Sequence, residues 1–442
     1  MKVFDKFTGE AIGEVAEADA RSVDEALTHL AAYTPPPAYE RKEALLRVRD
    51  AVAAKRDRFR EAITAEAGFP IRDAEGEIAR ALQTLALCAE EAGRMTGETV
   101  PLEGAPDGAG RIGFTLRVPT GVVVAITPFN APLNTVCHKV GPAYAAGNGV
   151  ALKPSEKTPL TAELLQACFD EAGAGDAIRL LHGGPDVAGL LLGDPRPGFY
   201  AFTGSTAVGA SIQAQVGLRR TQMELGSISA TVVLADADIE AAARKCCGAS
   251  FRKAGQVCTS IQMLMVEEPA MDVFREAYLS EARGLVAGNP HDPDTDVGPL
   301  ISQAAAERVE AMLDGQNVIL GGAREGSVIT PTVVEDPGGR MLTEEVFGPV
   351  AALIPVASLS DAIDRVNATP FGLATGLFTN DLTAAMEAAR RLHVGGVHIN
   401  ETSSSRVDLM PYGGVKASGF GHEGPARAVR EMSEERLVTI TA

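Results

Sequence analysis

Two side chains in this sequence could supply a nucleophile and a base. Cys258 lies in Gly-Gln-Val-Cys-Thr-Ser, 255–260, between an expected helix over 239–251 and an expected strand that starts at 262. A cysteine thiolate is a soft nucleophile, although a single cysteine is more often a small buried hydrophobic side chain. Glu224 ends an expected strand shortly before a glycine, where a carboxylate either caps a turn or acts as a general base.

Asn130 could stabilise negative charge that develops on a substrate oxygen. It follows the first expected strand, 122–126, within Thr-Pro-Phe-Asn, 127–130. A side-chain amide at the carboxyl end of a strand can donate a hydrogen bond to an oxyanion. Asparagine beside proline is also common in ordinary turns, so both roles stay open.

Three segments could contact a nucleotide. Lys-Pro-Ser-Glu, 153–156, follows an expected strand over 150–152, and Phe-Thr-Gly-Ser, 202–205, opens an expected helix. Backbone N–H groups at a helix N-terminus bind pyrophosphate, but this segment is not the usual Gly-x-Gly-x-x-Gly. In the third segment, 345–349, a glutamate could accept from a ribose hydroxyl and a phenylalanine could flank a ring, although a surface turn would fit the same residues.

Strands that alternate with helices must position these groups. From residue 121 to the helix that starts at 206, short β-branched runs alternate with amphipathic segments, and a second alternation runs from about 231 to 400. Such alternation predicts doubly wound parallel sheets, with ligands beyond the carboxyl ends of the strands. Residues 19–99 have apolar side chains at helical spacing.

Two further segments are expected to form β structure outside these layers. The segment 101–119 is rich in glycine and then alternates apolar with polar residues, which is typical of a projecting hairpin. The tail 436–442 is also strand-like. The two can pair within one subunit or between subunits.

The composition excludes several classes of function. The chain carries 40 Lys and Arg against 58 Asp and Glu, a net charge of −18, so we expect neither a nucleic-acid partner nor an anionic membrane surface. Its apolar runs are far shorter than the roughly 20 residues of a membrane helix, and its charged N-terminus is unlike a secretory signal. Six cysteines without a Cys-x-x-Cys pair argue against structural zinc and a disulfide framework. We therefore expect no metal and a reducing, cytoplasmic compartment.

Six ordered motifs make the chain resemble the NAD(P)-dependent aldehyde dehydrogenase superfamily over essentially its whole length. They are TPFN at 127–130, KPSE at 153–156, FTGS at 202–205, ELGS at 224–227, GQVCTS at 255–260 and EEVFGPV at 344–350. A closing PYGGVK at 411–416, followed by Ser418 and Gly419, is also similar to the family pattern. Within the family, the chain most resembles the lactaldehyde and phosphonoacetaldehyde dehydrogenase branch.

The resemblance implies an aldehyde dehydrogenase-like α/β fold in three parts. A Rossmann-type, doubly wound NAD-binding domain would comprise residues 1–100 and 120–226, and a second α/β catalytic domain residues 227–416. The segments 101–119 and 417–442 would form oligomerisation or bridging elements. Because a projecting hairpin and a strand-like tail would otherwise leave an unpaired edge, a homodimer or homotetramer is expected.

The resemblance also implies a reaction sequence. Cys258 attacks the aldehyde carbon, while Asn130 and the backbone N–H of Cys258 hold the oxyanion. Loss of hydride to the nicotinamide leaves a thioester on Cys258, and Glu224 deprotonates the water that hydrolyses it. Family position makes Lys139 and Glu423 further candidates for a proton path.

Cofactor contacts follow from the same resemblance. Lys153 and Glu156 match positions at the adenosine ribose, Ser205 a position at the pyrophosphate, and Glu345 and Phe347 positions at the nicotinamide ribose and beside the nicotinamide. Further cofactor-binding candidates from these motifs are Thr127, Phe129, Ser155, Gly204 and Leu225. A carboxylate at Glu156 would accept from a 2′-hydroxyl and repel a 2′-phosphate, which favours NAD over NADP, although Lys153 could pair with that phosphate.

The resemblance indicates a small aldehyde substrate, of the lactaldehyde or phosphonoacetaldehyde type. Arg406 lies by family position near the substrate mouth and either binds an anionic tail bidentately or pairs with Asp408 or another acid. Val257 is apolar where some relatives specific for anionic aldehydes carry arginine, and Leu133 also adds no positive charge, so an uncharged hydroxylated tail fits as well.

Two alternative functions remain open at this point. A succinate-semialdehyde-type or CoA-acylating semialdehyde dehydrogenase is the nearest alternative, but a CoA-acylating enzyme need not keep the base Glu224. A catalytically idle relative is more remote, because Cys258, Glu224 and Asn130 are all present.

Overall fold

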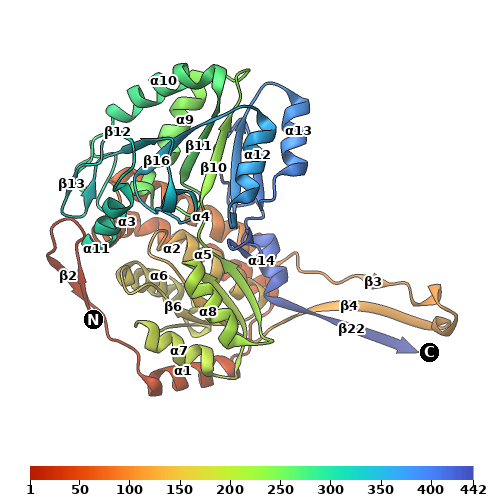
Figure 1. Cartoon of the computed structure of the whole chain (residues 1–442). Helices are drawn as coiled ribbons and strands as arrows, with labels where there is room; N and C mark the ends of the chain where they lie inside the picture. Colours follow the sequence, from red (N-terminus) through yellow and green to blue (C-terminus); the bar gives the residue numbers. More distant parts are fainter. Residues whose placement is uncertain (442) are drawn as a thin grey trace.

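The structure is a computed structural model that describes residues 1–441. Two α/β layers lie one above the other, and a long β arm projects from the region where they meet (Figure 1). Ala442, the last residue of the expected tail strand, lies outside the described residues.

The first layer is built on a six-stranded sheet with the order β21-β9-β8-β5-β6-β7. Its strands are β5 (Val122–Ile126), β6 (Gly149–Lys153), β7 (Ile178–Leu180), β8 (Pro197–Thr203), β9 (Arg220–Glu224) and β21 (Gly419–Phe420). All neighbours are parallel except β21 and β9. Every residue of β5 and β6 is buried, as expected for parallel strands that are covered on both faces.

Helices cover both faces of this sheet. One face packs against α1 (Ala20–Ala32), α7 (Pro185–Gly193) and α8 (Thr206–Val216). The helices associated with the other face are α2 (Ala38–Ala54), α3 (Arg56–Ala67), α4 (Ile71–Ala92), α5 (Asn134–Ala146), α6 (Pro159–Glu171) and α14 (Pro425–Glu431). Successive strand residues serve the two faces in turn, since Val123 belongs to one apolar cluster and Val124 to the other. The doubly wound sheet is confirmed, and the helical character predicted for residues 19–99 is confirmed as far as Ala92, whereas Thr99 lies in strand β3.

The second layer is a seven-stranded sheet that is parallel except at one edge. Its strands, in spatial order, are β12 (Val318–Leu320), β15 (Thr332–Glu335), β16 (Val350–Val356), β11 (Ile261–Glu267), β10 (Ser229–Val233), β18 (Ala374–Phe378) and β19 (Gly396–Ile399). Only β12 runs antiparallel to its neighbour. The helices α9 (Ile239–Phe251), α10 (Met271–Arg283) and α11 (Gln303–Leu313) share one apolar cluster, whereas α12 (Leu359–Ala368) and α13 (Leu382–Arg391) share another.

The arm is a three-stranded sheet of β3 (Thr99–Val100), β4 (Arg111–Pro119) and β22 (Ser433–Thr441). β22 runs antiparallel to β4 from Ser433, opposite Pro119, to Thr441, opposite Arg111. The tail therefore pairs with the projecting segment within one chain.

The segment 417–442 is divided between the arm and the first layer. β21 forms the edge of the first sheet beside β9, and α14 packs against α4 and α5. Of the helices and strands in this segment, only β22 lies in the arm.

Three short antiparallel pairs complete the strands. They are β1 (Lys2–Phe4) with β2 (Ala11–Glu14), β13 (Arg324–Glu325) with β14 (Val328–Ile329), and β17 (Phe371–Gly372) with β20 (Val415–Lys416). Within residues 1–441, none of the helices combines the length and the apolar character that crossing a membrane requires.

Candidate active site

A cavity of about 640 Å³ lies where β5, β6, β8 and β9 end and where loops of the second layer face them. Fifteen of the sixteen site residues expected from the sequence line it: Thr127, Phe129, Asn130, Lys153, Ser155, Glu156, Gly204, Ser205, Glu224, Leu225, Cys258, Glu345, Phe347, Arg406 and Glu423. Lys139 is not part of the lining, but its ammonium group contacts Glu423 behind it. The carboxyl ends of the parallel strands thus form one side of the cavity, as doubly wound sheets require.

A tight turn after α9 presents Cys258 to the cavity. Lys253 and Ala254 both have a φ of 53°, and Gly255 has a φ of 69°. A Cβ atom on Gly255 would lie 2.0 Å from the carbonyl oxygen of Gly348, so only glycine fits there. Left-handed backbone at non-glycine residues is strained, and such strain is found mainly at functional sites.

The thiol of Cys258 has one hydrogen-bond partner among the described residues. Its Sγ atom lies 2.8 Å from Oη of Tyr412. Burial raises the pKa of the Cys258 thiol to about 11, while the hydrogen bond with Tyr412 and the positive charge of Arg406 act in the opposite direction. Tyr412 and Arg406 therefore both favour formation of the Cys258 thiolate.

Asn130 is fixed beside the segment that carries the nucleophile. Its Nδ2 atom donates to the backbone carbonyl oxygen of Gln256 at 2.9 Å, and the backbone carbonyl oxygen of Asn130 accepts from Nζ of Lys253 at 2.9 Å. Lys253 is ion-paired with Glu77, which also accepts from the backbone N–H of Leu133 just before α5. Because an amide nitrogen carries two hydrogens, the second stays available for an oxyanion.

Glu224 is the last residue of β9 and is 3% exposed. Both of its carboxylate oxygens are buried and accept no hydrogen bond from the described residues, so the side chain does not cap a turn. Burial raises the pKa of Glu224 well above its ordinary value, and the negative charge of Glu423 raises it further. A carboxyl group in this state can exchange a proton with a nearby water.

Glu423 lies between two cations. Nζ of Lys139 donates to Oε1 at 2.9 Å, and Nη2 of Arg406 donates to Oε2 at 2.8 Å. Burial alone would raise the pKa of Glu423, but the positive charges of Lys139 and Arg406 hold it well below its ordinary value. Glu423 is therefore ionised, whereas its neighbour Glu224 is protonated more easily.

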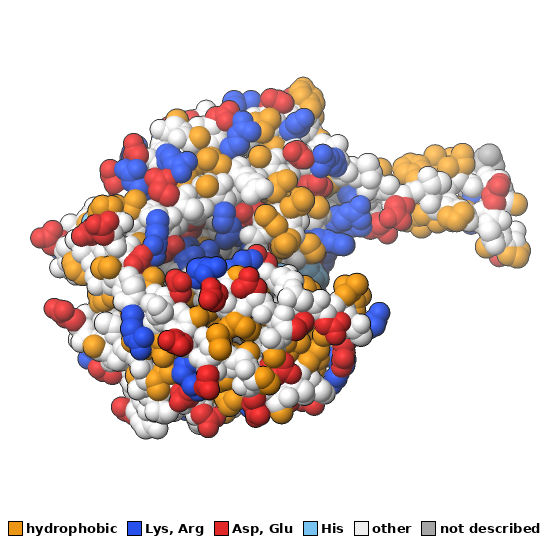
Figure 2. Space-filling model, turned by 90° about the horizontal axis from the view of Figure 1, so that it is seen from above, with side chains coloured by type: hydrophobic (Ala, Val, Ile, Leu, Met, Phe, Trp, Pro, Cys, Tyr) orange, Lys and Arg blue, Asp and Glu red, His pale blue; other side chains and the backbone are white. Residues whose placement is uncertain are grey.

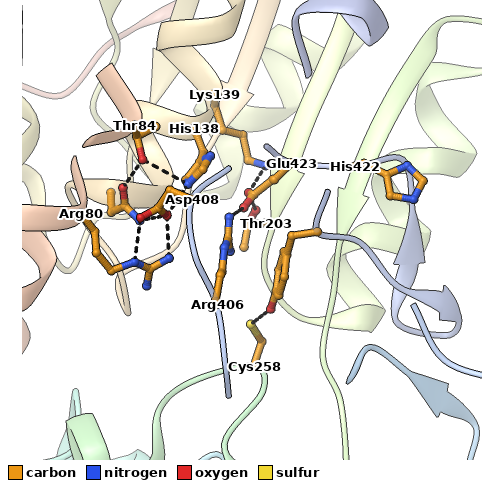
Figure 3. A network of polar contacts seen from close by, with 12 residues as sticks. Arg80, Thr84, His138, Lys139, Thr203, Cys258, Arg406, Asp408, His422 and Glu423 are labelled. Carbon is orange, nitrogen blue, oxygen red and sulfur yellow. Dashed lines mark hydrogen bonds and ion pairs between the residues drawn. The ribbon is translucent and has the colours of Figure 1, made fainter. Parts of the chain in front are cut away.

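Arg406 is bound on two sides. Besides its ion pair with Glu423, its guanidinium group lies 3.8 Å from the centroid of the Tyr412 ring, while its buried Nε atom has no partner among the described residues. The acid that Arg406 pairs with is Glu423 and not Asp408, because Asp408 accepts from Arg80 at 2.7 Å and from His138 at 2.8 Å (Figure 3).

The cofactor candidates from the first sheet gather at the strand ends. Ser205 caps α8, accepting a hydrogen bond from the backbone N–H of Val208 at 3.4 Å. Nζ of Lys153 donates to the carbonyl oxygen of Pro154 at 3.3 Å, and burial lowers the pKa of Lys153. Glu156 is half-buried at the cavity edge.

The candidates from the second layer face them across the cavity. Oε1 of Glu345 accepts from the backbone N–H of Ser227 at 3.0 Å, and burial raises the pKa of Glu345 to about 7. A Cβ atom on Gly226 would lie 2.7 Å from Oε2 of Glu345, so a larger residue would fill the space beside that carboxyl. The ring of Phe347 lies edge-on to that of Phe129, with centroids 6.0 Å apart.

Sequence reasoning missed several residues that line the cavity, among them Tyr412, Arg252 and Arg80. Tyr412 lies within the quoted PYGGVK motif, but nothing in the motif indicates that its hydroxyl reaches Cys258. Arg252 lies just outside the GQVCTS motif, and Arg80 lies on α4 with no sequence signal at all. Only the folded chain brings Arg80 and Tyr412 to the cavity that Cys258 lines.

Comparison with known proteins identifies the family that the motifs indicate. A family model described as aldehyde dehydrogenase family matches residues 1–438. A 3-sulfolactaldehyde dehydrogenase of Priestia aryabhattai is 43% identical over 454 residues, which cover 100% of this chain and 94% of that protein. A lactaldehyde dehydrogenase of Methanococcus maripaludis is 35% identical over 458 residues, which cover 100% of this chain and 97% of that protein.

Solved structures agree closely with the whole chain. Aldehyde dehydrogenase 21 of Physcomitrella patens, in complex with the reaction product succinate, matches with a TM-score of 0.96 and 33% identity, covering 100% of this chain and 95% of that one. A glyceraldehyde-3-phosphate dehydrogenase of Methanocaldococcus jannaschii, complexed with NADP, matches with a TM-score of 0.95 and 34% identity, covering 100% of this chain and 99% of that one.

Proposed function

The chain belongs to the aldehyde dehydrogenase family and is an NAD(P)-dependent aldehyde oxidoreductase, and from this premise we propose that it oxidises a small polar aldehyde to the acid through a thioester on Cys258. One observation carries the proposal. The thiol of Cys258, the amide of Asn130 and the unpaired carboxyl of Glu224 line one cavity. These are the nucleophile, the oxyanion donor and the base that acyl transfer to water requires.

In the first step, the Cys258 thiolate adds to the aldehyde carbon. The sulfur lone pair forms the C–S bond, and the carbonyl π electrons move to the oxygen. The free hydrogen on Nδ2 of Asn130 stabilises this oxyanion together with the backbone N–H of Cys258. Because Gln256 accepts from the amide of Asn130 and Lys253 donates to the Asn130 backbone, the amide is oriented before the substrate arrives.

The residues around the cavity fit a nicotinamide dinucleotide. Lys153 and Glu156 would hold the adenosine ribose, because they supply a cation and an acceptor at one side of the cavity. Ser205 and the N–H groups at the N-terminus of α8 would hold the pyrophosphate. Glu345 would accept a hydrogen bond from the second ribose on the opposite side of the cavity. When bound, the cofactor supplies the hydride acceptor that aldehyde oxidation requires.

In the last step, Glu224 deprotonates the water that attacks the thioester. Its buried carboxyl has a raised pKa, so the carboxylate is a stronger base than an exposed one. The negative charge of Glu423 favours the protonated form of Glu224, and so helps Glu224 to take the proton from the attacking water. The ion pair of Lys139 with Glu423 then gives this proton a polar route away from the cavity.

The first prediction tests this proposal with a panel of lactaldehyde, 3-sulfolactaldehyde, phosphonoacetaldehyde, succinic semialdehyde and propanal, followed by the absorbance of the reduced cofactor. Wild-type protein should oxidise the polar aldehydes, and Cys258→Ala should abolish turnover. Glu224→Gln should lower kcat by about a hundredfold or more because general-base catalysis is lost, while a thioester accumulates that intact-protein mass spectrometry detects. Wild-type kcat should rise as the pH passes through the raised pKa of Glu224.

Two outcomes would contradict the mechanism. Turnover by Cys258→Ala would exclude the thioester, and undiminished hydrolysis by Glu224→Gln would exclude the base. If coenzyme A accelerates wild-type turnover and appears as an acyl thioester, the chain is a CoA-acylating enzyme instead.

The charge of the cavity supports a polar or anionic substrate tail. Six cationic side chains line it, of which three are ion-paired with the buried carboxylates of Glu77, Asp408 and Glu423 and three form no ion pair among the described residues. The six are Arg80, Lys153, Arg252, Lys253, Arg308 and Arg406. A tail with hydroxyl, carboxylate or sulfonate oxygens would be attracted to this lining, which agrees with the lactaldehyde and 3-sulfolactaldehyde substrates in the names of the relatives.

We propose that Arg252 is the main contact for an anionic tail, beside the earlier candidate Arg406. Arg252 is half-buried, and its side chain makes no hydrogen bond or ion pair within the described part of the chain. The guanidinium of Arg406 is already paired with Glu423. Arg252 can therefore bind a tail without breaking an existing ion pair.

The second prediction compares KM values for an anionic and a neutral aldehyde. Arg252→Gln should raise the KM for 3-sulfolactaldehyde about tenfold, the loss expected for a charge-assisted hydrogen bond, and leave the KM for propanal nearly unchanged. Arg244→Gln, an exposed arginine on α9 outside the cavity, is the matched control. If Arg406→Gln raises the KM for 3-sulfolactaldehyde, relative to that for propanal, more than Arg252→Gln does, then Arg406 is the main contact for the anionic tail.

The cofactor preference is proposed from one carboxylate. Glu156 lines the cavity near Lys153, at the position expected for the adenosine ribose. A negative charge there repels the 2′-phosphate of NADP. We therefore propose NAD as the preferred cofactor, although the Methanocaldococcus jannaschii relative is complexed with NADP.

As the third prediction, kcat/KM with NAD should exceed kcat/KM with NADP. Glu156→Gln should raise kcat/KM with NADP and so bring the two values closer together. Steady-state kinetics with both cofactors at low ionic strength measures it. A wild-type preference for NADP would overturn the assignment.

We propose that the chain assembles as a homodimer or homotetramer through the arm and works in the cytoplasm. The arm exposes Ile112 and Leu116 of β4 and Ile440 of β22, and Ile112 lies directly opposite Ile440. Figure 2 shows hydrophobic side chains along the projecting arm. A row of exposed apolar residues on a projecting sheet is typical of an interface. The cysteines are all free, which suits a reducing compartment.

The fourth prediction concerns this assembly. Light scattering on wild-type protein should give the mass of two or four chains, and Ile112→Glu combined with Ile440→Glu should reduce it, because charges are costly to bury at an interface. Leu218→Glu, which changes an exposed apolar residue on the loop after α8, should leave the mass unchanged. A wild-type monomer at micromolar concentration would refute the assembly.

A further inference from the structure

We propose that Tyr412 is a catalytic residue that donates a hydrogen bond to the Cys258 thiolate, and that Arg406 and Glu423 hold it in place for that purpose. The inference rests on the proposed role of Cys258 as the nucleophile. It assigns a function to a hydroxyl group that the reaction steps described above do not use.

The hydroxyl of Tyr412 lies within hydrogen-bonding distance of the Cys258 sulfur. Oη of Tyr412 lies 2.8 Å from Sγ of Cys258, which is short for a contact that involves sulfur. No other polar atom among residues 1–441 forms a hydrogen bond with this sulfur. The two residues are 154 positions apart in the sequence, so the contact requires the complete fold.

The second support concerns the direction of the hydrogen bond. Burial raises the pKa of Tyr412 well above its ordinary value, and the neighbouring Cys258 raises it further. The phenol therefore keeps its proton when the thiol loses one. A neutral phenol beside a thiolate can only donate, and a donated hydrogen bond stabilises the charged form of its acceptor.

The third support is the way the phenol is held. Tyr412 and Glu423 exchange two backbone hydrogen bonds, of 3.0 Å from the N–H of Tyr412 and 2.7 Å from the N–H of Glu423. The guanidinium of Arg406 lies on the face of the Tyr412 ring and is itself paired with Glu423. Glu423 thus fixes the backbone of Tyr412 directly and its ring through Arg406.

Lys139 anchors this arrangement from the first layer. Its ammonium group, on α5, donates to Glu423 and also to Oε1 of Gln222 on β9 at 3.2 Å. Figure 3 shows Lys139, Glu423 and Arg406 in sequence toward Cys258. A cation over an aromatic face withdraws electron density from the ring, so Arg406 makes the phenol a better donor.

The consequence for catalysis is a larger thiolate fraction at a given pH. The apolar surroundings of Cys258 oppose ionisation, and the Tyr412 hydrogen bond offsets part of that effect. When the sulfur forms a bond to the aldehyde carbon its negative charge disappears, and the hydrogen bond weakens. Tyr412 therefore acts on the nucleophile before the attack.

The test measures the thiolate directly, without cofactor or aldehyde. Iodoacetamide alkylates Cys258 by forming an S–C bond and releasing iodide, and the rate follows the thiolate fraction across the pH range. Tyr412→Phe should raise the apparent pKa of alkylation by about one unit or more and slow alkylation about tenfold or more at a fixed pH below that pKa. The rate in Cys258→Ala corrects for the other five cysteines, all of which are buried.

Two further variants distinguish stabilisation of the thiolate by the Tyr412 hydroxyl from a general change in the structure of the site. Tyr39→Phe, at an exposed tyrosine, should leave the alkylation profile unchanged. Arg406→Lys keeps a cation for Glu423 but loses the planar group over the ring, and should raise the pKa by a smaller amount than Tyr412→Phe. Thermal unfolding of each variant establishes that it is folded.

The result can overturn the inference in two ways. An unchanged alkylation pKa in a folded Tyr412→Phe protein would mean that the phenol does not stabilise the thiolate. A lower pKa would mean that the thiol donates to the phenol. Either result leaves the proposed aldehyde oxidation intact, and a failure to oxidise any aldehyde would leave the alkylation result intact.

Discussion

The candidate active site is arranged around the buried carboxylate of Glu423, which is held between the cations of Lys139 and Arg406. A charge inside a protein is tolerated only when it is paired, and Glu423 uses both cations. Glu224, in the same cavity, has no such partner and keeps both carboxylate oxygens free. Their surroundings thus shift the pKa values of the two carboxyls in opposite directions, which agrees with the proton transfer proposed for Glu224.

The two layers of the fold contribute different parts of the chemistry. The segments after the strands of the first sheet supply Asn130, Glu224 and most of the cofactor candidates, while the second layer supplies Cys258 on its strained turn together with Glu345 and Phe347. Because the ion pair of Lys253 with Glu77 and its hydrogen bond to the backbone of Asn130 join the layers, the proposed nucleophile Cys258 and the proposed oxyanion donor Asn130 are fixed relative to each other. Such preorganisation is where much of the catalytic effect of an enzyme originates.

The chain between β19 and β21 gives the site its third part. It leaves the second layer, passes the cavity and returns to the edge of the first sheet, and it carries Arg406, Tyr412 and Glu423 on the way. Arg406 is therefore tied to the nucleophile through Tyr412, while the unpaired Arg252 faces the same cavity. One family fold can accept different aldehydes by changing such lining residues, since the reacting groups stay in place.

The sequence alone was enough to predict the family, the doubly wound sheets and the side chains proposed to react, because strand and helix periodicity is local and the motifs around Asn130, Glu224 and Cys258 are contiguous. Tertiary structure decided how the distant parts meet. It paired β22 with β4 in one chain, gave Arg406 to Glu423 instead of Asp408, and brought Tyr412 to Cys258. These contacts join residues far apart in the sequence, and their side-chain directions depend on the packing of both layers, so no local pattern could predict them.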